Sequence, residues 1–459
     1  MVFSSTIFMF LFLPLTILCY YGLPRRRNFI LVLASLIFYA WGAPKFIVLL
    51  VANITIDYIL ALLIHKEPRK MLRKALFVFS IVINLGLLIY YKYSNFFIGQ
   101  INSLSDVHFQ WTEVVLPIGI SFFIFHKISY IVDIYRGTKS PFASLPDMFL
   151  YIMFFPQLIA GPIVRFHEIA DQIISRTHTV DRFFEGSWRF ALGLGKKVII
   201  ANTLGVHADA VFNAPVTELS FISAWTGVLC YTFQIYFDFS GYSDMAIGLG
   251  KMFGFELPEN FNRPYISASI TEFWRRWHMS LSRFFKDYLY LPLGGNRVSH
   301  FRTYLNLWTV FFLCGLWHGA NWTFVVWGLY HGFLLVLDKW FLLKQLDRFP
   351  IAFRNIVTFM LVVIGWVFFR SESITYSLNF LKSMFSNPFN TPIVLTMNDK
   401  MVVIFIIAVL LSFARVKFNY PISETYFPIV KGLVMLLITI FSTCIIATGS
   451  FNPFIYFQF

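Results

Sequence analysis

Long apolar runs recur along this chain, and they constrain its fold more than any other feature. In the first third they occupy 6–23, 28–43, 45–64, 74–91 and 114–135. A helix needs about 20 apolar residues to cross the hydrocarbon core of a bilayer, and it satisfies its own backbone hydrogen bonds there. Charged residues make up 13% of the sequence, whereas a soluble domain has about 25%. The sequence therefore predicts an all-α polytopic membrane protein.

The apolar runs return in the last third of the chain, near 303–317, 320–340, 355–370, 401–414 and 432–449. Segment 371–399 mixes polar and apolar residues, and we expect an amphipathic element at the surface there. Together the runs predict about ten to twelve spans. The first run, Met1 to Gly22, has no preceding basic residue and no small-residue cleavage site. We therefore expect it to remain as a span rather than to act as a cleaved signal peptide.

The region 136–300 differs, because its apolar stretches are shorter and interrupted. Proline, glycine and charge break them at Phe155-Pro156-Gln157, at Ala160-Gly161-Pro162 and at Gly193-Leu194-Gly195-Lys196-Lys197. Irregular backbone at membrane depth is tolerated where it is buried in protein or lines a cavity. We therefore expect broken or re-entrant helices around a functional site. We interpret the chain as one membrane domain, with N-terminal spans in 1–135, a catalytic core in 136–340 and C-terminal spans in 341–459.

The formal net charge is +14, and the distribution of Lys and Arg indicates an orientation. Basic clusters follow the first, third and fifth runs, at Arg25–Arg27, at 66–74 and at Arg136 with Lys139. These clusters fall on one side if every run crosses, and Lys and Arg are concentrated in cytoplasmic loops. We therefore expect the clusters in the cytoplasm and the N-terminus outside. No Arg- or Lys-rich tail or RNA-binding motif supports binding to nucleic acid.

The four cysteines lie far apart in apolar sequence, at Cys19, Cys230, Cys314 and Cys444. They form no CxxC pair and match no zinc spacing, so we interpret them as reduced packing residues. The sequence predicts neither a metal site nor a tightly bound cofactor.

Segment 273–297 gathers cations among aromatic residues. Its cations are Arg275, Arg276, Arg283, Lys286 and Arg297, and two of its aromatic residues are Trp274 and Trp277. Arginine favours phosphate and carboxylate because its planar fork binds two oxygens at once. Pro292 and the Gly294-Gly295 pair interrupt any helix and allow backbone to approach a ligand. The alternative is an interfacial helix that Trp and Arg anchor at the lipid headgroups.

A second segment, 314–322, places His318 in an apolar, aromatic stretch between two expected spans. Ionisable residues inside a membrane are costly and indicate function by default. A neutral imidazole is a suitable base for a hydroxyl proton near pH 7. The alternative is a histidine that hydrogen-bonds another helix. We interpret His331, thirteen residues further on, as structural.

A third segment, 236–244, has two carboxylates in apolar sequence, Asp238 and Asp244. We expect a supporting role for both. They would orient a histidine, pair with an arginine of the basic segment, or cap helices near Gly241.

These motifs resemble the membrane-bound O-acyltransferase (MBOAT) family, in its alginate O-acetyltransferase-like branch. FWRRWHMSLSRFFKDYLYLPLGGNR is followed, forty residues after His278, by GLWHGANWTFVVWGLYHG at His318. The resemblance extends to LPIGISFFIFHKISYIVD at 116–133, FPQLIAGPIVR at 155–165, FDFSGYSDMAIGLG at 237–250 and the ending PFIYFQF. It implies that His318 is the catalytic histidine of the WHG motif and that His278 is the second functional histidine.

The resemblance also implies a fold and a reaction. Spans would form a ring around thin, re-entrant helices, where a cytoplasmic acyl thioester meets an acceptor from the other face of a bacterial cytoplasmic (inner) membrane. Acetyl-CoA would bind against the cations and tryptophans of segment 273–297. His318 would act as general base, and His278 would orient or polarise the thioester. Asp238, Asp244 and Asn321 would support them.

By the same resemblance, the acetyl group would pass to an exported partner of the SGNH-like acetyltransferase type, which modifies a polysaccharide. The nearest alternative is the D-alanyl-lipoteichoic acid transferase branch, whose donor is an acylated carrier protein. A polysaccharide transporter or channel is a remote alternative, because its typical inverted repeats are not seen in the sequence. The polymer itself is not indicated.

Overall fold

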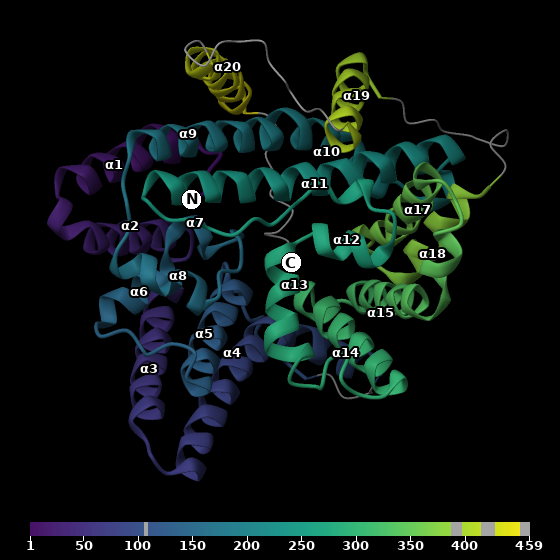
Figure 1. Cartoon of the computed structure of the whole chain (residues 1–459). Coiled ribbons are helices and arrows are strands. Elements are labelled where there is room, and N and C mark those ends of the chain that lie inside the picture. Colours follow the sequence, from purple (N-terminus) through teal and green to yellow (C-terminus); the bar gives the residue numbers. More distant parts are fainter. Residues whose placement is uncertain (105–108, 387–396, 415–426, 450–459) are drawn as a thin grey trace. The chain divides into compact units, whose positions relative to one another are not determined.

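The computed structural model describes residues 1–104, 109–386, 397–414 and 427–449. All regular secondary structure in these ranges is helical (Figure 1). The chain forms two compact units, of which the first comprises Met1–Phe190 with Ser243–Pro258 and the second Ala191–Tyr242 with Glu259–Phe459. The predicted all-α fold is confirmed. The division of a single domain at 135 and 340 remains a prediction. The ending PFIYFQF, which forms part of the resemblance, lies outside the described residues.

The first unit begins with two helices that meet at a sharp bend. The helical segments Phe8–Gly22 and Pro24–Gly42 are inclined by 106°; the first ends in α1 (Leu13–Gly22) and the second contains α2 (Arg27–Gly42). Pro24 starts the turn between them because proline lacks an N–H and fits the beginning of a helix. The basic triplet Arg25–Arg27 therefore lies at the bend.

A three-helix bundle follows, formed by α3 (Ile47–Lys66), α4 (Lys70–Leu104) and α5 (Ile120–Arg136). An ion pair lies buried inside it, with Lys127 Nζ 3.0 Å from Asp57 Oδ2. Asp57 also accepts hydrogen bonds from Ser80 Oγ at 2.7 Å and Asn84 Nδ2 at 2.9 Å. One side chain on α3 thus binds groups on both neighbouring helices.

The rest of the first unit has short helices, as the interrupted sequence predicted. They are α6 (Leu145–Met153), α7 (Phe155–Leu158) and α8 (Phe166–Ile174). Residues 159–165, which include Ala160-Gly161-Pro162, form no helix. The breaks predicted at Pro156 and Pro162 are therefore confirmed.

The break predicted at Gly193–Lys197 is wrong. Helix α9 (Val180–Gly195) continues through a π-helical turn, Lys196–Ala201, into α10 (Asn202–Phe212). The small residues serve helix packing instead. A Cβ added at Gly241 of α11 (Phe221–Met252) would lie 2.7 Å from the Gly193 carbonyl oxygen. Because α11 runs unbroken through this position, the proposed helix caps near Gly241 are also wrong.

The second unit contains the remaining helices. After α11 come α12 (Ile270–Arg276), α13 (Met279–Phe285), α14 (His300–His318), α15 (Trp322–Leu337), α16 (Leu343–Leu346), α17 (Ile351–Arg370), α18 (Ile374–Met384), α19 (Asp399–Phe413) and α20 (Phe427–Ala447). Helix α18 buries Phe380 and Met384 and exposes Asn379 and Lys382, as expected for an amphipathic element. The part of segment 371–399 at 387–396 lies outside the described residues.

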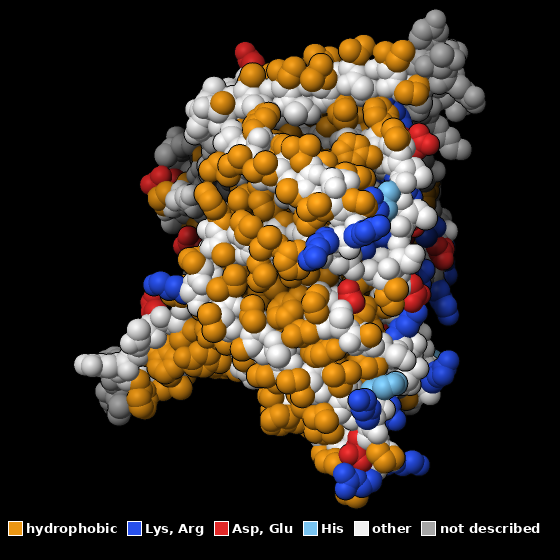
Figure 2. Space-filling view, turned by 90° about the vertical axis from the view of Figure 1, so that its left-hand side faces the viewer, with side chains coloured by type: hydrophobic (Ala, Val, Ile, Leu, Met, Phe, Trp, Pro, Cys, Tyr) orange, Lys and Arg blue, Asp and Glu red, His pale blue; other side chains and the backbone are white. Residues whose placement is uncertain are grey.

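Hydrophobic side chains cover most of the face shown in Figure 2. Large apolar residues are exposed on several helices, for example Leu18, Val48 and Leu437. Such residues are suited to contact with lipid rather than water. By length and hydropathy, five described helices qualify as spans, or six if the bent pair counts as one. The larger number of about ten to twelve, which also counts shorter helices, stays a prediction.

Candidate active site

A close helix crossing in the second unit fixes the position of His318. Helices α14 and α15 contact each other along their length. A Cβ added at Gly315 would lie 2.4 Å from the Phe324 carbonyl oxygen, and one at Gly328 would lie 2.4 Å from the Phe311 carbonyl oxygen. Small residues allow such backbone contact between membrane helices. His318 is the last residue of α14, one turn beyond Gly315.

Aromatic rings enclose His318, whose side chain is buried. Ring centroids lie 4.9 Å away for Trp317, 5.0 Å for Trp327 and 5.2 Å for Phe369, all in edge contact. This environment excludes water from the imidazole. It is the kind of site in which a proton transfer is sensitive to the position of each group.

His278 has a strained backbone and a defined ring orientation. Its φ is +43°, a left-handed conformation that costs a non-glycine residue about 1–2 kcal/mol. Its Nδ1 lies 3.1 Å from Asn260 Oδ1, which also accepts from Ser280 N at 3.2 Å and Ser280 Oγ at 2.9 Å. Since the backbone N–H of Ser280 can only donate, the Asn260 atom is the acceptor, and Nδ1 of His278 carries the hydrogen.

This tautomer limits what His278 can do. A neutral ring with hydrogen on Nδ1 presents a lone pair at Nε2, which accepts a hydrogen bond from a hydroxyl group. Polarising a carbonyl would require a ring protonated on both nitrogens. Backbone strain in a buried histidine held by an asparagine is typical of functional sites.

One tryptophan connects the two histidines that the sequence singled out. The Trp317 ring lies 4.9 Å from the His318 ring and 6.1 Å from the His278 ring, centroid to centroid. Phe239 contacts His278 from another side, at 4.7 Å. Segments forty residues apart in the chain are thus brought to a common aromatic cluster.

The cations of segment 273–297 differ in their surroundings. Arg276 forms an ion pair with Glu272 at 2.8 Å, and Arg283 Nη2 lies 3.4 Å from the Glu259 carbonyl oxygen. The remaining three, Arg275, Lys286 and Arg297, are exposed. Helix α13 continues through a π-helical turn to Tyr290, and Gly294 has a φ of +103°. The interruption expected at Pro292 and Gly294-Gly295 is therefore confirmed.

Trp274 and Trp277 are buried in aromatic packing. Trp274 Nε1 lies 3.4 Å from His331 Nδ1 and donates to it, and the Trp277 ring lies 4.9 Å from that of Trp366. A Cβ added at Gly365 would lie 2.7 Å from His331 Nε2. These contacts bury both tryptophans and His331. Substrate binding by the tryptophans and the structural role of His331 stay predictions.

The two aspartates pair with cations outside the basic segment. Asp238 lies 2.7 Å from Lys197 Nζ inside the second unit, and Asp244 lies 2.8 Å from Arg189 Nη2 inside the first. Asn321 caps helix α15, with Oδ1 accepting from Thr323 N at 3.1 Å, and its amide donates to the Glu372 carbonyl oxygen. It shapes the turn after His318.

The sequence did not indicate that Asn260 or Asn306 contributes to the site. Asn306, on α14, donates to the Leu293 carbonyl oxygen at 3.1 Å and so ties the turn before α14 to the helix. Both are single polar residues without a motif of their own. Asn306 had one signal, a polar residue inside an apolar run, whereas Asn260 lies in a polar loop where nothing distinguishes it.

Comparison with known proteins decides the family. The model of the membrane-bound O-acyltransferase family matches residues 138–378, more than half of the chain. The chain belongs to the MBOAT family. This stretch contains both histidines and the basic segment, and the resemblance inferred from the motifs is confirmed.

Named relatives of this MBOAT chain are acyltransferases. Probable alginate O-acetylase AlgI of Pseudomonas aeruginosa is 47% identical over 84% of this chain and 75% of its own length. The peptidoglycan O-acetyltransferase of Helicobacter pylori is 39% identical over 84% of this chain and 80% of its own. The teichoic acid D-alanyltransferase of Bacillus subtilis is 27% identical over 56% of this chain and 69% of its own. The protein is therefore a membrane O-acyltransferase.

Proposed function

We propose that this enzyme passes an acetyl group from cytoplasmic acetyl-CoA across the bacterial inner membrane for O-acetylation of an exported polysaccharide. The immediate acceptor is a hydroxyl group, which we assign to an exported partner of the SGNH-like acetyltransferase type. The observation that carries the proposal is the buried pair His318 and His278 around Trp317. It lies in a chain that is 47% identical to a probable alginate O-acetylase.

His318 acts as general base in this mechanism. It takes the proton of the acceptor hydroxyl as the oxygen attacks the thioester carbonyl carbon. The new C–O ester bond forms, the C–S bond breaks, and the proton passes from His318 to the coenzyme A sulfur. Because the thioester is already activated, the protein mainly supplies orientation and proton transfer.

His278 acts as an orienting residue. Its Nε2 lone pair accepts a hydrogen bond from another N–H or O–H group of the bound substrates, since Asn260 holds the hydrogen on Nδ1 and the single proton of the reacting hydroxyl goes to His318. The exposed cations Arg275, Lys286 and Arg297 bind the anionic donor. Asp238 supports the site through Lys197, and Asn321 through the turn that follows His318.

The similarity to O-acetylating relatives favours acetyl over D-alanyl transfer. The chain is 39% identical to a peptidoglycan O-acetyltransferase over 84% of its length, but 27% identical to a D-alanyltransferase over 56%. If the enzyme uses an acylated carrier protein as its donor, it belongs to the D-alanyl transferase branch instead.

The test is turnover of labelled acetyl-CoA by the purified chain in lipid, with host membrane extract as the source of the acceptor. We expect His318→Ala to lower the rate by about 100-fold or more, the usual contribution of a general base. His300→Ala is a matched control, because His300 lies exposed at the other end of α14 and should leave the rate unchanged.

Equal activity of wild type and His318→Ala, with both proteins monodisperse, would show that His318 has a structural role. Consumption of an acylated carrier protein in place of acetyl-CoA would assign the enzyme to the D-alanyl branch.

A further inference from the structure

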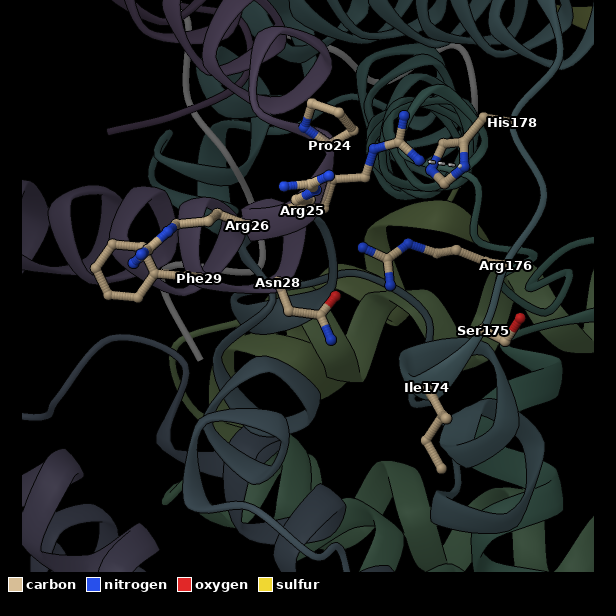
Figure 3. Close-up of a pocket in the computed structure, with 10 residues that line it drawn as sticks. Pro24, Arg25, Arg26, Asn28, Phe29, Ile174, Ser175, Arg176 and His178 are labelled. Atoms are coloured by element: carbon tan, nitrogen blue, oxygen red, sulfur yellow. Dashed lines mark hydrogen bonds between the residues drawn. The ribbon is translucent and has the colours of Figure 1, made fainter.

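A pocket of about 770 Å³ in the first unit is lined by four arginines (Figure 3). Arg25, Arg26 and Arg27 come from the bend before α2, and Arg176 comes from the segment after α8. No aspartate or glutamate is among the ten lining residues. This volume lies within the usual range for small-molecule sites, about 300–1,000 Å³.

Arg27 is held in position by aromatic and histidine contacts. Its guanidinium carbon lies 5.4 Å from the centre of the Tyr20 ring and 5.7 Å from that of Tyr21. Its Nη1 donates to His178 Nδ1 at 3.0 Å, the dashed line in Figure 3. Because a guanidinium can only donate, Nδ1 is an acceptor. The hydrogen of His178 is therefore on Nε2, 2.8 Å from the Tyr20 hydroxyl, which in turn donates to the Phe253 carbonyl oxygen.

Arg176 is held by the same network. Its Nε donates to the Tyr20 hydroxyl at 3.0 Å and to the Phe253 carbonyl oxygen at 3.1 Å, and its guanidinium lies 4.3 Å from the Phe255 ring. Burial, Arg27 and Arg176 all lower the pKa of His178, so the ring stays neutral and continues to accept from Arg27 at neutral pH. Two of the four guanidinium groups are thus oriented in advance.

The accessible donors at the pocket belong to Arg25 and Arg26. Arg27 Nε and Arg176 Nη2 also lack a hydrogen-bond partner, but both atoms are buried. The side chains of Arg25 and Arg26 are exposed, and in the described part of the chain they form no hydrogen bond or ion pair. The nearby carboxylate, Asp147, instead binds the Asn28 amide at 3.0 Å.

Four like charges that form no salt bridge within the described residues repel one another, and the nearby Asp147, which acts on Arg176, offsets only part of this charge unless an anion joins them. Guanidinium groups bind phosphate through paired hydrogen bonds, and a cluster of them suits a group with several charged oxygens. We propose that this pocket binds a phosphate-bearing ligand, at the face of the membrane where the basic triplet lies.

Two sources present that chemistry at a cytoplasmic face. One is coenzyme A, with its pyrophosphate and 3′-phosphate, and this source rests on the proposed function. The other is the headgroup of an anionic phospholipid, which is abundant at that surface. In the first case the pocket would be a second binding site for coenzyme A, separate from Arg275, Lys286 and Arg297, and in the second it would anchor the bend between α1 and α2.

The experiment uses the full chain in phosphatidylcholine nanodiscs. Binding of labelled coenzyme A is compared between wild type and the double variant Arg25→Gln/Arg26→Gln, whose exposed side chains have no internal contacts to lose. The matched control is Lys66→Gln/Lys70→Gln, which removes two exposed charges elsewhere in the first unit. Loss of charge-assisted hydrogen bonds should weaken binding by about tenfold or more in the first variant and leave the control unchanged.

The lipid arm uses nanodiscs of phosphatidylcholine with phosphatidylglycerol and counts retained phosphatidylglycerol by native mass spectrometry. Loss of retained phosphatidylglycerol in the arginine variant alone would support the proposal, with a phospholipid as the ligand of the pocket. If both variants bind coenzyme A and phosphatidylglycerol as wild type does, the proposal is overturned.

A His318→Ala background separates this proposal from the transfer reaction. Binding at the arginine pocket should be unchanged in that variant, because it requires no chemistry. Failure of acetyl transfer by the wild type, with intact pocket binding, would therefore contradict the proposed function alone.

Discussion

Asn260 sets the hydrogen-bonding state of His278 from outside any recognisable motif. Its Oδ1 collects the His278 ring N–H and both donors of Ser280. Sequence predicted the two histidines because they lie in long motifs. It could not predict Asn260, whose contact depends on the left-handed turn at His278 rather than on spacing along a helix.

Removing this acceptor should release the His278 ring while the chain still folds. Asn260→Ala removes the shared acceptor of three hydrogen bonds, and a typical hydrogen bond contributes about 0.5–1.5 kcal/mol net. We expect at least about a tenfold fall in kcat with KM little changed, measured as acetyl-CoA turnover.

Asn260→Asp is the companion variant, because it keeps an oxygen at the same place. It should retain more activity than Asn260→Ala. Equal loss in both variants would show that Asn260 acts only through packing.

At the scale of elements, the apolar runs predicted the longer helices at the two ends of the chain, α1 to α5 and α14, α15, α17, α19 and α20. They failed where a glycine could either break a helix or allow two helices to pack closely. At Gly193 and Gly195 the sequence indicated a break, but the helix continues: Gly241 of α11 packs against the Gly193 carbonyl oxygen, and Gly195 faces Ile438 of α20. Composition cannot separate a helix break from a close helix contact, because both require the absence of a side chain. Nor could it predict the partners of Asp238 and Asp244, which lie on a different helix.

The bundle of α3, α4 and α5 should depend on its buried ion pair. Lys127→Met leaves Asp57 charged and buried, and breaking such a pair costs about 3–5 kcal/mol. We expect a clear fall in the thermal unfolding temperature of the purified chain. Lys139→Met is the matched control, because its pair with Asp171 is 2.8 Å long but exposed, and exposed pairs contribute about 0–1 kcal/mol. Equal shifts for the two variants would contradict the argument.

At the scale of the whole molecule, the sequence predicted the all-α fold class and the family. The predicted orientation of the chain in the membrane rests on the basic clusters alone. The bend of 106° between the first two helical segments places Arg25–Arg27 at a turn, as a cluster at a membrane surface requires. The number of spans was harder to predict, because several helices are shorter than a full crossing.

Orientation can be measured with single cysteines in a background where the four native cysteines are alanine. We expect Lys66→Cys to react with a membrane-impermeant maleimide in broken membranes but not in intact spheroplasts. Gln110→Cys, in a loop poor in Lys and Arg, should react in both. The reverse pattern would place the N-terminus in the cytoplasm.

The crossing of α14 and α15 has a consequence for how such an enzyme changes during evolution. Alanine is the smallest replacement for glycine, and at Gly315 or Gly328 even one methyl group has no room. The position of His318 therefore cannot change gradually through small substitutions at this crossing. Rings around it, such as Phe369, can lose or gain atoms one at a time, so a preference for a different acyl group would arise there while the helix crossing stayed constant.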